Sequence, residues 1–106
     1  MEQTTRQWGY YRVLHEVPGM KVKELTVEPG KSLSMQKHYK RAEYWIVSEG
    51  IAQVETEFET LQLMLHETIE IPIGSWHRLY NTSDKPCRIV EIQYGKDCIE
   101  EDIERK

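Results

Sequence analysis

The sequence predicts an all-β protein with a single domain, either an antiparallel sandwich or a barrel. Turn-forming residues interrupt the 106-residue chain at short intervals, at 18–19, 29–30, 49–50, 72–74, 81–84 and 94–95. Between these turns, short runs of residues alternate between apolar and polar, as strands with one buried face do. About seven such strands at this spacing are typical of a sandwich or barrel. A chain of this length can bury one core but not two, so the domain is expected to span 1–106.

The expected strands follow one another along the chain. The first covers 20–27, where Val22, Leu25 and Val27 are interspersed with charged residues. Further strands are expected at 43–47, 51–56, 61–65, 69–73, 76–80 and 88–94. The aromatic segment 6–11 is interpreted as an N-terminal strand that caps the sheet, or as a dimer interface, because Tyr and Trp favour surfaces that are packed on one side and wet on the other. The acidic segment 99–106 is expected to form a short helix or a frayed tail.

Composition excludes several classes of protein. Charged residues make up 30% of the chain and the net charge is −4, so general nucleic-acid binding is not expected. No apolar run approaches the roughly 18 residues that a membrane span requires, and the first residues lack a signal-peptide pattern. The protein is therefore expected to be cytoplasmic and not membrane-bound. Cys87 and Cys98 form no close pair and are expected to be free thiols.

The most informative motif is Gly30-x5-Gln36-x-His38-x4-Glu43-x6-Gly50. Gln36 and His38 are two residues apart, so on a strand their side chains leave the same face of the sheet. Glu43 lies at an odd offset from His38. The chain must therefore turn near 40–42 to return Glu43 beside His38 on the next strand, with Gly50 ending that strand at a tight turn.

A second motif, Pro72-x-Gly74-x2-His77-x3-Asn81, supplies another histidine from a later strand. The predicted metal ligands are Gln36, His38, Glu43 and His77. This mixed nitrogen and oxygen set suits Zn²⁺, Mn²⁺, Fe²⁺, Co²⁺ or Ni²⁺. No thiolate belongs to it, and such a site can leave coordination positions for water or substrate.

These two segments resemble the two motifs of the cupin superfamily, whose members fold as a double-stranded β-helix, or jelly-roll barrel. The chain departs from that pattern at Gln36, where most cupins have His, and at His66, where the second motif usually begins with Gly. The residues 36–45 are more specifically similar to the Q-M-H-x-H-R-A-E-H-W signature of type II phosphomannose isomerases. Because mannose-6-phosphate isomerases bind zinc through Gln, His, Glu and His, the resemblance implies zinc as the metal.

Other segments extend the resemblance along nearly the whole chain. The residues 6–11 resemble the family's R-P-W-G-x-Y opening, 89–95 its L-I-E-V-Q-x-G strand and 101–105 its E-D-D-I-x-R tail. Lys40 and Tyr44 stand where the family usually has His, and the chain ends at Lys106, before the family's terminal acidic stretch. These 106 residues contain no Gly-rich phosphate-binding loop of the kind found in a nucleotidyltransferase.

The resemblance implies a metal-dependent isomerase that converts mannose 6-phosphate to fructose 6-phosphate by proton transfer through an enediol. Lys40 is a candidate cation or base, and Arg41 and Arg78 are candidate phosphate partners. Glu91 and Gln93 share one strand face, which lines the pocket or faces solvent; the resemblance favours the pocket. Trp45 stands beside a ligand, where it could stack on the sugar or pack in the core. The predicted catalytic residues are Lys40, Arg78 and Glu91, and the predicted substrate-binding residues are Arg41, Trp45 and Gln93.

A different class of function stays open at this point. The chain could be a metal-containing cupin that binds a sugar or small anion without turnover, possibly beside a separate guanylyltransferase, because a fold does not determine a function. The small-molecule partner is expected to be a sugar phosphate, and a homodimer is expected.

Overall fold

The computed structural model describes residues 2–106 and confirms the all-β prediction. No helix is formed within these residues, so none could cross a membrane. The strands are β1 (Thr4–Arg6), β2 (Gly9–Val17), β3 (Met20–Val27), β4 (Gln36–Lys37), β5 (Arg41–Glu49), β6 (Ala52–Thr56), β7 (Thr60–Leu63), β8 (Thr68–Ile71), β9 (His77–Tyr80), β10 (Cys87–Gly95) and β11 (Glu104–Arg105).

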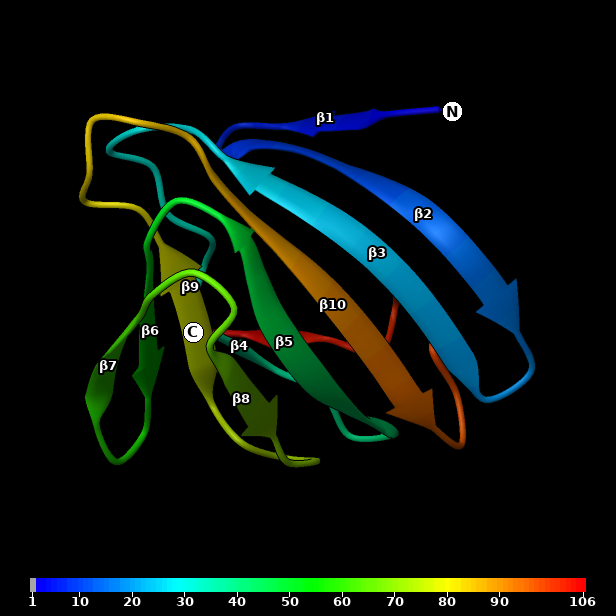
Figure 1. Cartoon of the computed structure of the whole chain (residues 1–106). Coiled ribbons are helices and arrows are strands. Elements are labelled where there is room, and N and C mark those ends of the chain that lie inside the picture. The colour runs from blue at the N-terminus through cyan, green and yellow to red at the C-terminus, as the bar shows by residue number, and fades with distance from the viewer. Residues whose placement is uncertain (1) are drawn as a thin grey trace.

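Two antiparallel sheets face each other. The larger sheet has the strand order β1-β2-β3-β10-β5-β8, and the smaller has the order β11-β4-β9-β6-β7. Long strands of the larger sheet run side by side across the molecule, with the short strands of the smaller sheet behind them (Figure 1). Because β5 is followed by β6 in the other sheet, and β8 by β9, the chain alternates between the layers as it folds.

The core lies between the sheets and follows from strand alternation. In β10, every second residue from Cys87 to Gln93 is buried, and β5 repeats the pattern from Arg41 to Val47. The apolar part of this interior consists of Leu25, Val27, Trp45, Val47, Ala52, Val54, Leu63, Ile71, Leu79, Cys87 and Ile89. The polar part is gathered towards one end of β5 and β10, where the same inward face carries charged and amide side chains instead of apolar ones.

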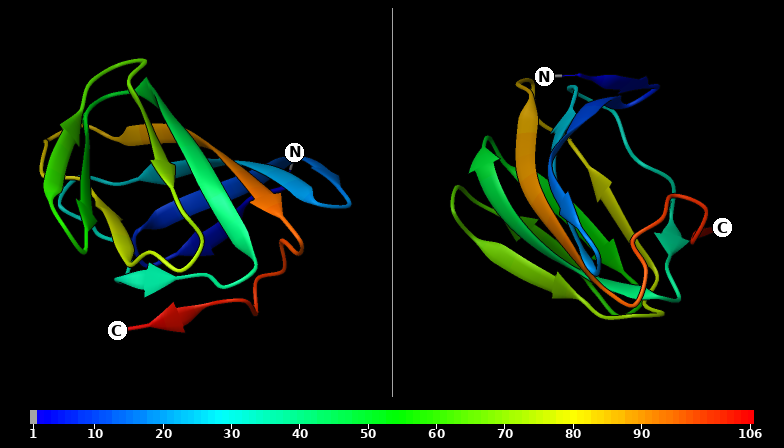
Figure 2. Two further views of the ribbon diagram at one scale, coloured as in Figure 1. Left: turned by 90° about the horizontal axis from the view of Figure 1, so that it is seen from below. Right: turned by 90° about the vertical axis from the view of Figure 1, so that its right-hand side faces the viewer.

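The C-terminal segment differs from the predicted helix or frayed tail. It extends along the open side of the interior, and its strand β11 pairs with β4 through Glu104↔Lys37 and Arg105↔Gln36. The views of Figure 2 show this segment beside β4, closing one side of the barrel. A short strand can form hydrogen bonds with the otherwise unpaired backbone groups at the edge of β4, whereas a helix could not.

Strand β2 also extends well beyond the aromatic segment that the sequence analysis identified. It pairs with β3 along nearly its whole length, and β1 pairs in turn with β2. Trp8 and Tyr11 pack against the core, so the N-terminal segment caps the sheet as expected. The alternative of a dimer interface stays a prediction.

One departure from the cupin pattern places a histidine in a backbone conformation that favours glycine. His66, which stands where the motif usually has glycine, has a φ of 70°. No other non-glycine residue among those described has positive φ. The left-handed region favours glycine because it lacks a Cβ atom. His66 therefore keeps the backbone conformation of the motif at an energetic cost.

Candidate metal centre

Three buried side chains converge at the polar end of the interior. The carboxylate of Glu43 has its Oε2 atom 3.2 Å from Nε2 of His38 and its Oε1 atom 3.7 Å from Nε2 of His77. All three ligand atoms lie within 4.8 Å of one another. The sequence analysis predicted these three residues together, and the structure brings them together from three segments of the chain.

The local structure explains how residues at irregular spacing meet. His38 follows the short strand β4, the chain bends at Tyr39 and Lys40, and β5 begins at Arg41. Because of this bend, the side chain of Glu43 points into the interior, on the same face of β5 as Trp45 and Val47. His77 is the first residue of β9, and its partner on the neighbouring strand β4 is Gln36.

Both imidazoles are held by backbone carbonyl groups. Nδ1 of His38 lies 2.7 Å from the carbonyl oxygen of Asp102, and Nδ1 of His77 lies 2.9 Å from that of Ser75. A carbonyl oxygen only accepts, so Nδ1 carries the proton and Nε2 presents a lone pair to the centre. Burial, followed by the charge of Arg41, lowers the pKa of His38 to about 4, and burial lowers the pKa of His77. Both rings are therefore neutral at pH 7, the form that binds metals.

Glu43 is oriented by two donors. Nε of Arg41 donates to Oε2 at 3.0 Å, and Nε1 of Trp45 donates to Oε1 at 3.0 Å. Nη2 of Arg41 also lies 3.3 Å from Nε2 of His38. Arg41 and Glu43 are both buried, so the guanidinium compensates a carboxylate that would otherwise be costly to bury.

Gln36 is half-buried and lines the same cavity as Glu43 and His77. Its Nε2 atom donates to the carbonyl oxygen of Ser34 at 3.3 Å. The amide oxygen is the atom that could complete the ligand set. Its participation stays a prediction.

The side chains fit a divalent cation. Two imidazole lone pairs and a carboxylate face one another, and each imidazole is fixed through its other nitrogen, as metal-binding histidines usually are. These groups repel one another unless positive charge lies between or beside them. The donor set is the nitrogen and oxygen set that suits zinc and neighbouring transition metals.

Two further polar residues of β10 lie beside this centre. Glu91 is 5% exposed and Gln93 is fully buried, so their shared strand face lines the interior as predicted. Nε2 of Gln93 donates to Oε1 of Glu91 at 2.6 Å, whereas Oε1 of Gln93 has no partner within the described structure. Burial, followed by the charge of Glu43, raises the pKa of Glu91 to about 7.

A cavity of about 390 Å³ opens from the metal centre towards the N-terminal strands. Besides Gln36, Glu43, His77, Glu91 and Gln93, its lining includes Arg41 and Trp45, both predicted to bind substrate. Trp45 is also part of the core and meets the ring of His77 edge-on, with 5.7 Å between the ring centroids. Both interpretations of Trp45 therefore agree with its position.

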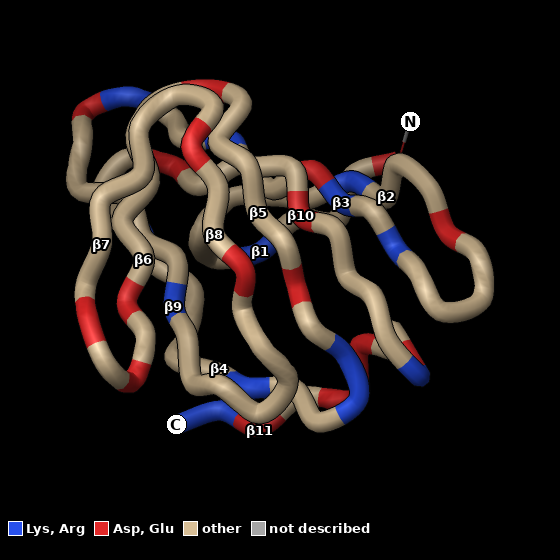
Figure 3. Tube along the Cα trace, turned by 60° about the horizontal axis from the view of Figure 1, so that its bottom comes forward, with Lys and Arg blue, Asp and Glu red and all other residues tan. Residues whose placement is uncertain are grey.

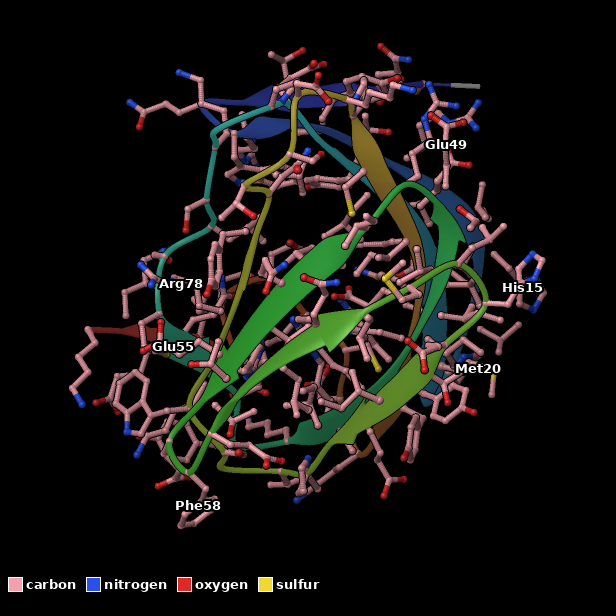
Figure 4. The ribbon with its side chains drawn as sticks, turned by 60° about the vertical axis from the view of Figure 1, so that its left-hand side comes forward. His15, Met20, Glu49, Glu55, Phe58 and Arg78 are labelled. Atoms are coloured by element: carbon pink, nitrogen blue, oxygen red, sulfur yellow. The ribbon has the colours of Figure 1, made fainter. Side chains whose placement is uncertain are left out.

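The structure does not bring two predicted catalytic residues into the cavity. Lys40 lies exposed at the bend before β5 and is not part of the cavity lining. Arg78 follows His77 and points to the opposite face of β9, where it pairs with Glu55 and stacks over Tyr80. Figure 4 shows Arg78 and Glu55 beside each other near the outer edge of the molecule. Because side chains alternate along a strand, Arg78 faces away from the metal centre and lies where it can pair with Glu55.

Three residues in or near the site, Lys21, Lys23 and Asp102, were missed by the sequence analysis. Lys21 and Lys23 are buried on the inward face of β3, and Lys23 lines the cavity. Their odd numbers match those of Leu25 and Val27, so strict alternation would have placed them inside. The contribution of Asp102 is its backbone carbonyl group, which no sequence pattern reveals.

Comparisons with known proteins show the family to which the chain belongs. The family model described as "Mannose-6-phosphate isomerase C-terminal" matches residues 1–106. The alginate biosynthesis protein AlgA of Pseudomonas aeruginosa is 44% identical over 94% of the chain, and the mannose-1-phosphate guanylyltransferase ManC of Salmonella typhimurium is 38% identical over the same share. The chain spans about a fifth of the length of these relatives, 21% in each case.

Solved structures show the same fold. A cupin-superfamily sugar phosphate isomerase from Silicibacter pomeroyi superposes with a TM-score of 0.74 at 18% identity, covering 80% of this chain and 58% of that one. The cupin domain of Schizosaccharomyces pombe Cnp3 gives a TM-score of 0.79 at 12% identity, covering 90% and 69%. These likenesses confirm the cupin barrel. The chain belongs to the mannose-6-phosphate isomerase C-terminal family of cupins.

Proposed function

We propose that the chain is a metal-dependent sugar-phosphate isomerase that interconverts mannose 6-phosphate and fructose 6-phosphate. The observation that carries this proposal is the position of Glu91. It is a buried carboxyl group in the same cavity as the neutral-imidazole metal centre. An aldose–ketose isomerase needs a base beside a site that can stabilise negative charge on two neighbouring oxygens.

His38, Glu43 and His77 would hold the metal, with Gln36 as the fourth ligand, and zinc is the first choice for this donor set. When bound, the metal supplies positive charge that stabilises the negative charge developing on the substrate oxygens. Arg41 and Trp45 fix the Glu43 carboxylate through their hydrogen bonds.

Glu91 acts as the proton carrier in this proposal. Its carboxylate takes the proton from C2 of the open-chain aldose while the C2–H electron pair forms the C1–C2 double bond and the aldehyde oxygen becomes the enediolate oxygen. The same group then returns that proton to C1, and the hydroxyl proton passes from O2 to O1, which leaves the ketone at C2. No oxidant or reductant is consumed.

Gln93 serves two purposes in this cavity. Its amide nitrogen holds Glu91 in position, and its unpartnered amide oxygen is free to accept a hydrogen bond from a sugar hydroxyl. A buried acceptor without a partner is costly. Substrate binding would supply the missing donor, so Gln93 supports the assignment of this cavity to a polyhydroxylated ligand.

The test is turnover of mannose 6-phosphate by the purified chain, first as isolated, then after chelation and then after addition of Zn²⁺ or Mn²⁺. We expect activity to disappear on chelation, to return with metal, and to be absent in His77→Ala. Bound metal without turnover would contradict the proposal and would favour the other function considered for the sequence, a non-catalytic cupin that binds a sugar or small anion.

A further inference from the structure

The cavity beside the metal centre carries an excess of positive charge. Its lining includes four cationic side chains, Arg6, Lys23, Arg41 and Arg105, and three carboxylates, Glu43, Glu91 and Glu100. Arg41 is already paired with Glu43. Of the remaining cations, Arg6 belongs to β1 and Lys23 to β3, whereas Arg105 lies on β11 opposite the predicted ligand Gln36. Figure 3 shows further basic residues on β11 and β4 and at the start of β5, on the strands that flank the metal centre.

Two of these cations gather around one aromatic ring. Nζ of Lys23 lies 4.2 Å and Cζ of Arg6 lies 5.5 Å from the ring centroid of Tyr11. Lys23 is 5% exposed and donates to Glu100 at 2.8 Å, whereas Arg6 pairs with no carboxylate in the described part of the chain. The Glu100 carboxylate also lies 3.5 Å from Nζ of Lys21, so two buried lysines share it. Arg6 adds a positive charge to the cavity lining that no carboxylate among the described residues neutralises, and this arrangement favours a further anion.

The strand register sets the order of the groups along the cavity. Glu91 has Trp45 as its partner on β5 and Lys23 as its partner on β3. Neighbouring strands are about 4.8 Å apart, so the β5 ligand strand and Lys23 are separated by about 10 Å with the proposed base between them. In an open-chain hexose 6-phosphate, the carbonyl end, C2 and the phosphate follow one another in the same order.

We propose that Arg6 and Lys23, gathered over Tyr11, bind the phosphate group of the substrate. This inference rests on the proposed function for the identity of the sugar, but its ligand chemistry is that of any phosphomonoester dianion. A guanidinium fork and an ammonium group both form charge-assisted hydrogen bonds with phosphate. The N-terminal motif that begins at Arg6 thereby gains a role in specificity.

Inorganic phosphate is the probe that separates this inference from catalysis. Titration calorimetry on the metal-loaded chain should detect phosphate binding in the wild type. Arg6→Gln and Lys23→Met should each weaken it by about tenfold, as expected for the loss of one charge-assisted hydrogen bond. Arg6→Lys should retain more affinity than Arg6→Gln. Arg12→Gln is the matched control, because Arg12 lies on the same hairpin but pairs with Glu24 outside the cavity.

A second readout distinguishes substrate binding from structural damage. In Arg6→Gln, the KM for mannose 6-phosphate should rise about tenfold with a smaller change in kcat, while the metal content stays at the wild-type level. Arg6 is exposed, so this variant should fold even if Lys23→Met does not.

The possible results separate the two proposals. Phosphate binding that depends on Arg6 and Lys23 in a chain without turnover would support the phosphate site and reject the isomerase. Wild-type phosphate affinity in both variants, or no phosphate binding by the wild type at millimolar concentration, would overturn the phosphate site whatever the turnover.

Discussion

The Nδ1 atom of His38 and the backbone carbonyl oxygen of Asp102 lie 2.7 Å apart, although 64 residues separate them in sequence. The carboxylate of Asp102 accepts hydrogen bonds from the backbone N–H groups of Tyr39 at 3.0 Å and Lys40 at 2.9 Å. One residue of the C-terminal segment therefore holds both the bend after β4 and the histidine that precedes it. The segment that closes the barrel therefore also supports the candidate metal centre.

Removing the Asp102 carboxylate should loosen this support. In Asp102→Ala the two backbone N–H groups lose their acceptor, and the carbonyl group that orients His38 is no longer anchored. We expect metal affinity to fall by about tenfold, as it does when the support of a ligand histidine is lost. Competition with a chelator would measure the change. Asp84→Ala, in an exposed loop, is the control, and equal affinities in the two variants would contradict this role.

Acid should destabilise the metal-free protein through its buried histidines. The pKa of His38 is lowered to about 4 in the folded chain, whereas the unfolded chain has the ordinary value near 6.5. Between these values the unfolded state binds more protons, so stability is lost as the pH falls from 6.5 towards 4. The slope from this one residue reaches about 1.4 kcal/mol per pH unit.

Urea unfolding at several pH values would measure this dependence. His38→Gln, which cannot titrate, should show a shallower slope between pH 6.5 and 4 than the wild type. The remaining slope includes His77, whose pKa burial also lowers. Identical slopes in the two proteins would show that His38 is not held neutral by the fold.

The catalytic role that the sequence predicts for Lys40 can be tested directly. Its side chain is exposed and lies outside the cavity, so Lys40→Ala should keep kcat within about threefold of the wild type, the range usual for exposed positions. Steady-state kinetics with mannose 6-phosphate would measure it. A loss of a hundredfold or more would instead restore Lys40 as a catalytic residue.

His66→Gly should stabilise the chain. His66 has a φ of 70° in an exposed turn, and glycine adopts this conformation without the steric cost of a Cβ atom. Because glycine also has more freedom in the unfolded chain, the net gain should be about 0.5–1 kcal/mol. Chemical denaturation of the metal-free protein would measure it, with Glu67→Gly in the same turn as a control that should destabilise.

Strand alternation accounts for most of what the sequence could predict. The bend before Glu43 and the shared strand face of Glu91 and Gln93 follow from residue parity, whereas the inward direction of that face was implied by the family resemblance. The same rule, applied strictly, also separates His77 from Arg78 and would have placed Lys23 inside. Lysines are rarely buried without a partner, and the partner of Lys23, Glu100, is remote in sequence, so the composition of this strand does not indicate the buried lysine.

Two features lay beyond sequence reasoning for a physical reason. The orientation of His38 depends on a backbone carbonyl group, which every residue has and no residue type reveals. The segment 99–106 was expected to be a helix or tail because its composition is acidic and polar. Its strand exists because β4 offers an unpaired edge, and this is a property of the assembled fold.

In the proposed reaction, Glu91 transfers a proton between C2 and C1 of a sugar phosphate bound beside the metal centre. Proton NMR of mannose 6-phosphate incubated in D₂O with the metal-loaded chain would follow this transfer. We expect fructose 6-phosphate with some deuterium at C1. In Glu91→Gln we expect at least a hundredfold slower formation, with metal binding retained. Wild-type rates in Glu91→Gln, or neither product nor deuterium exchange with the wild-type chain, would contradict the proposed reaction.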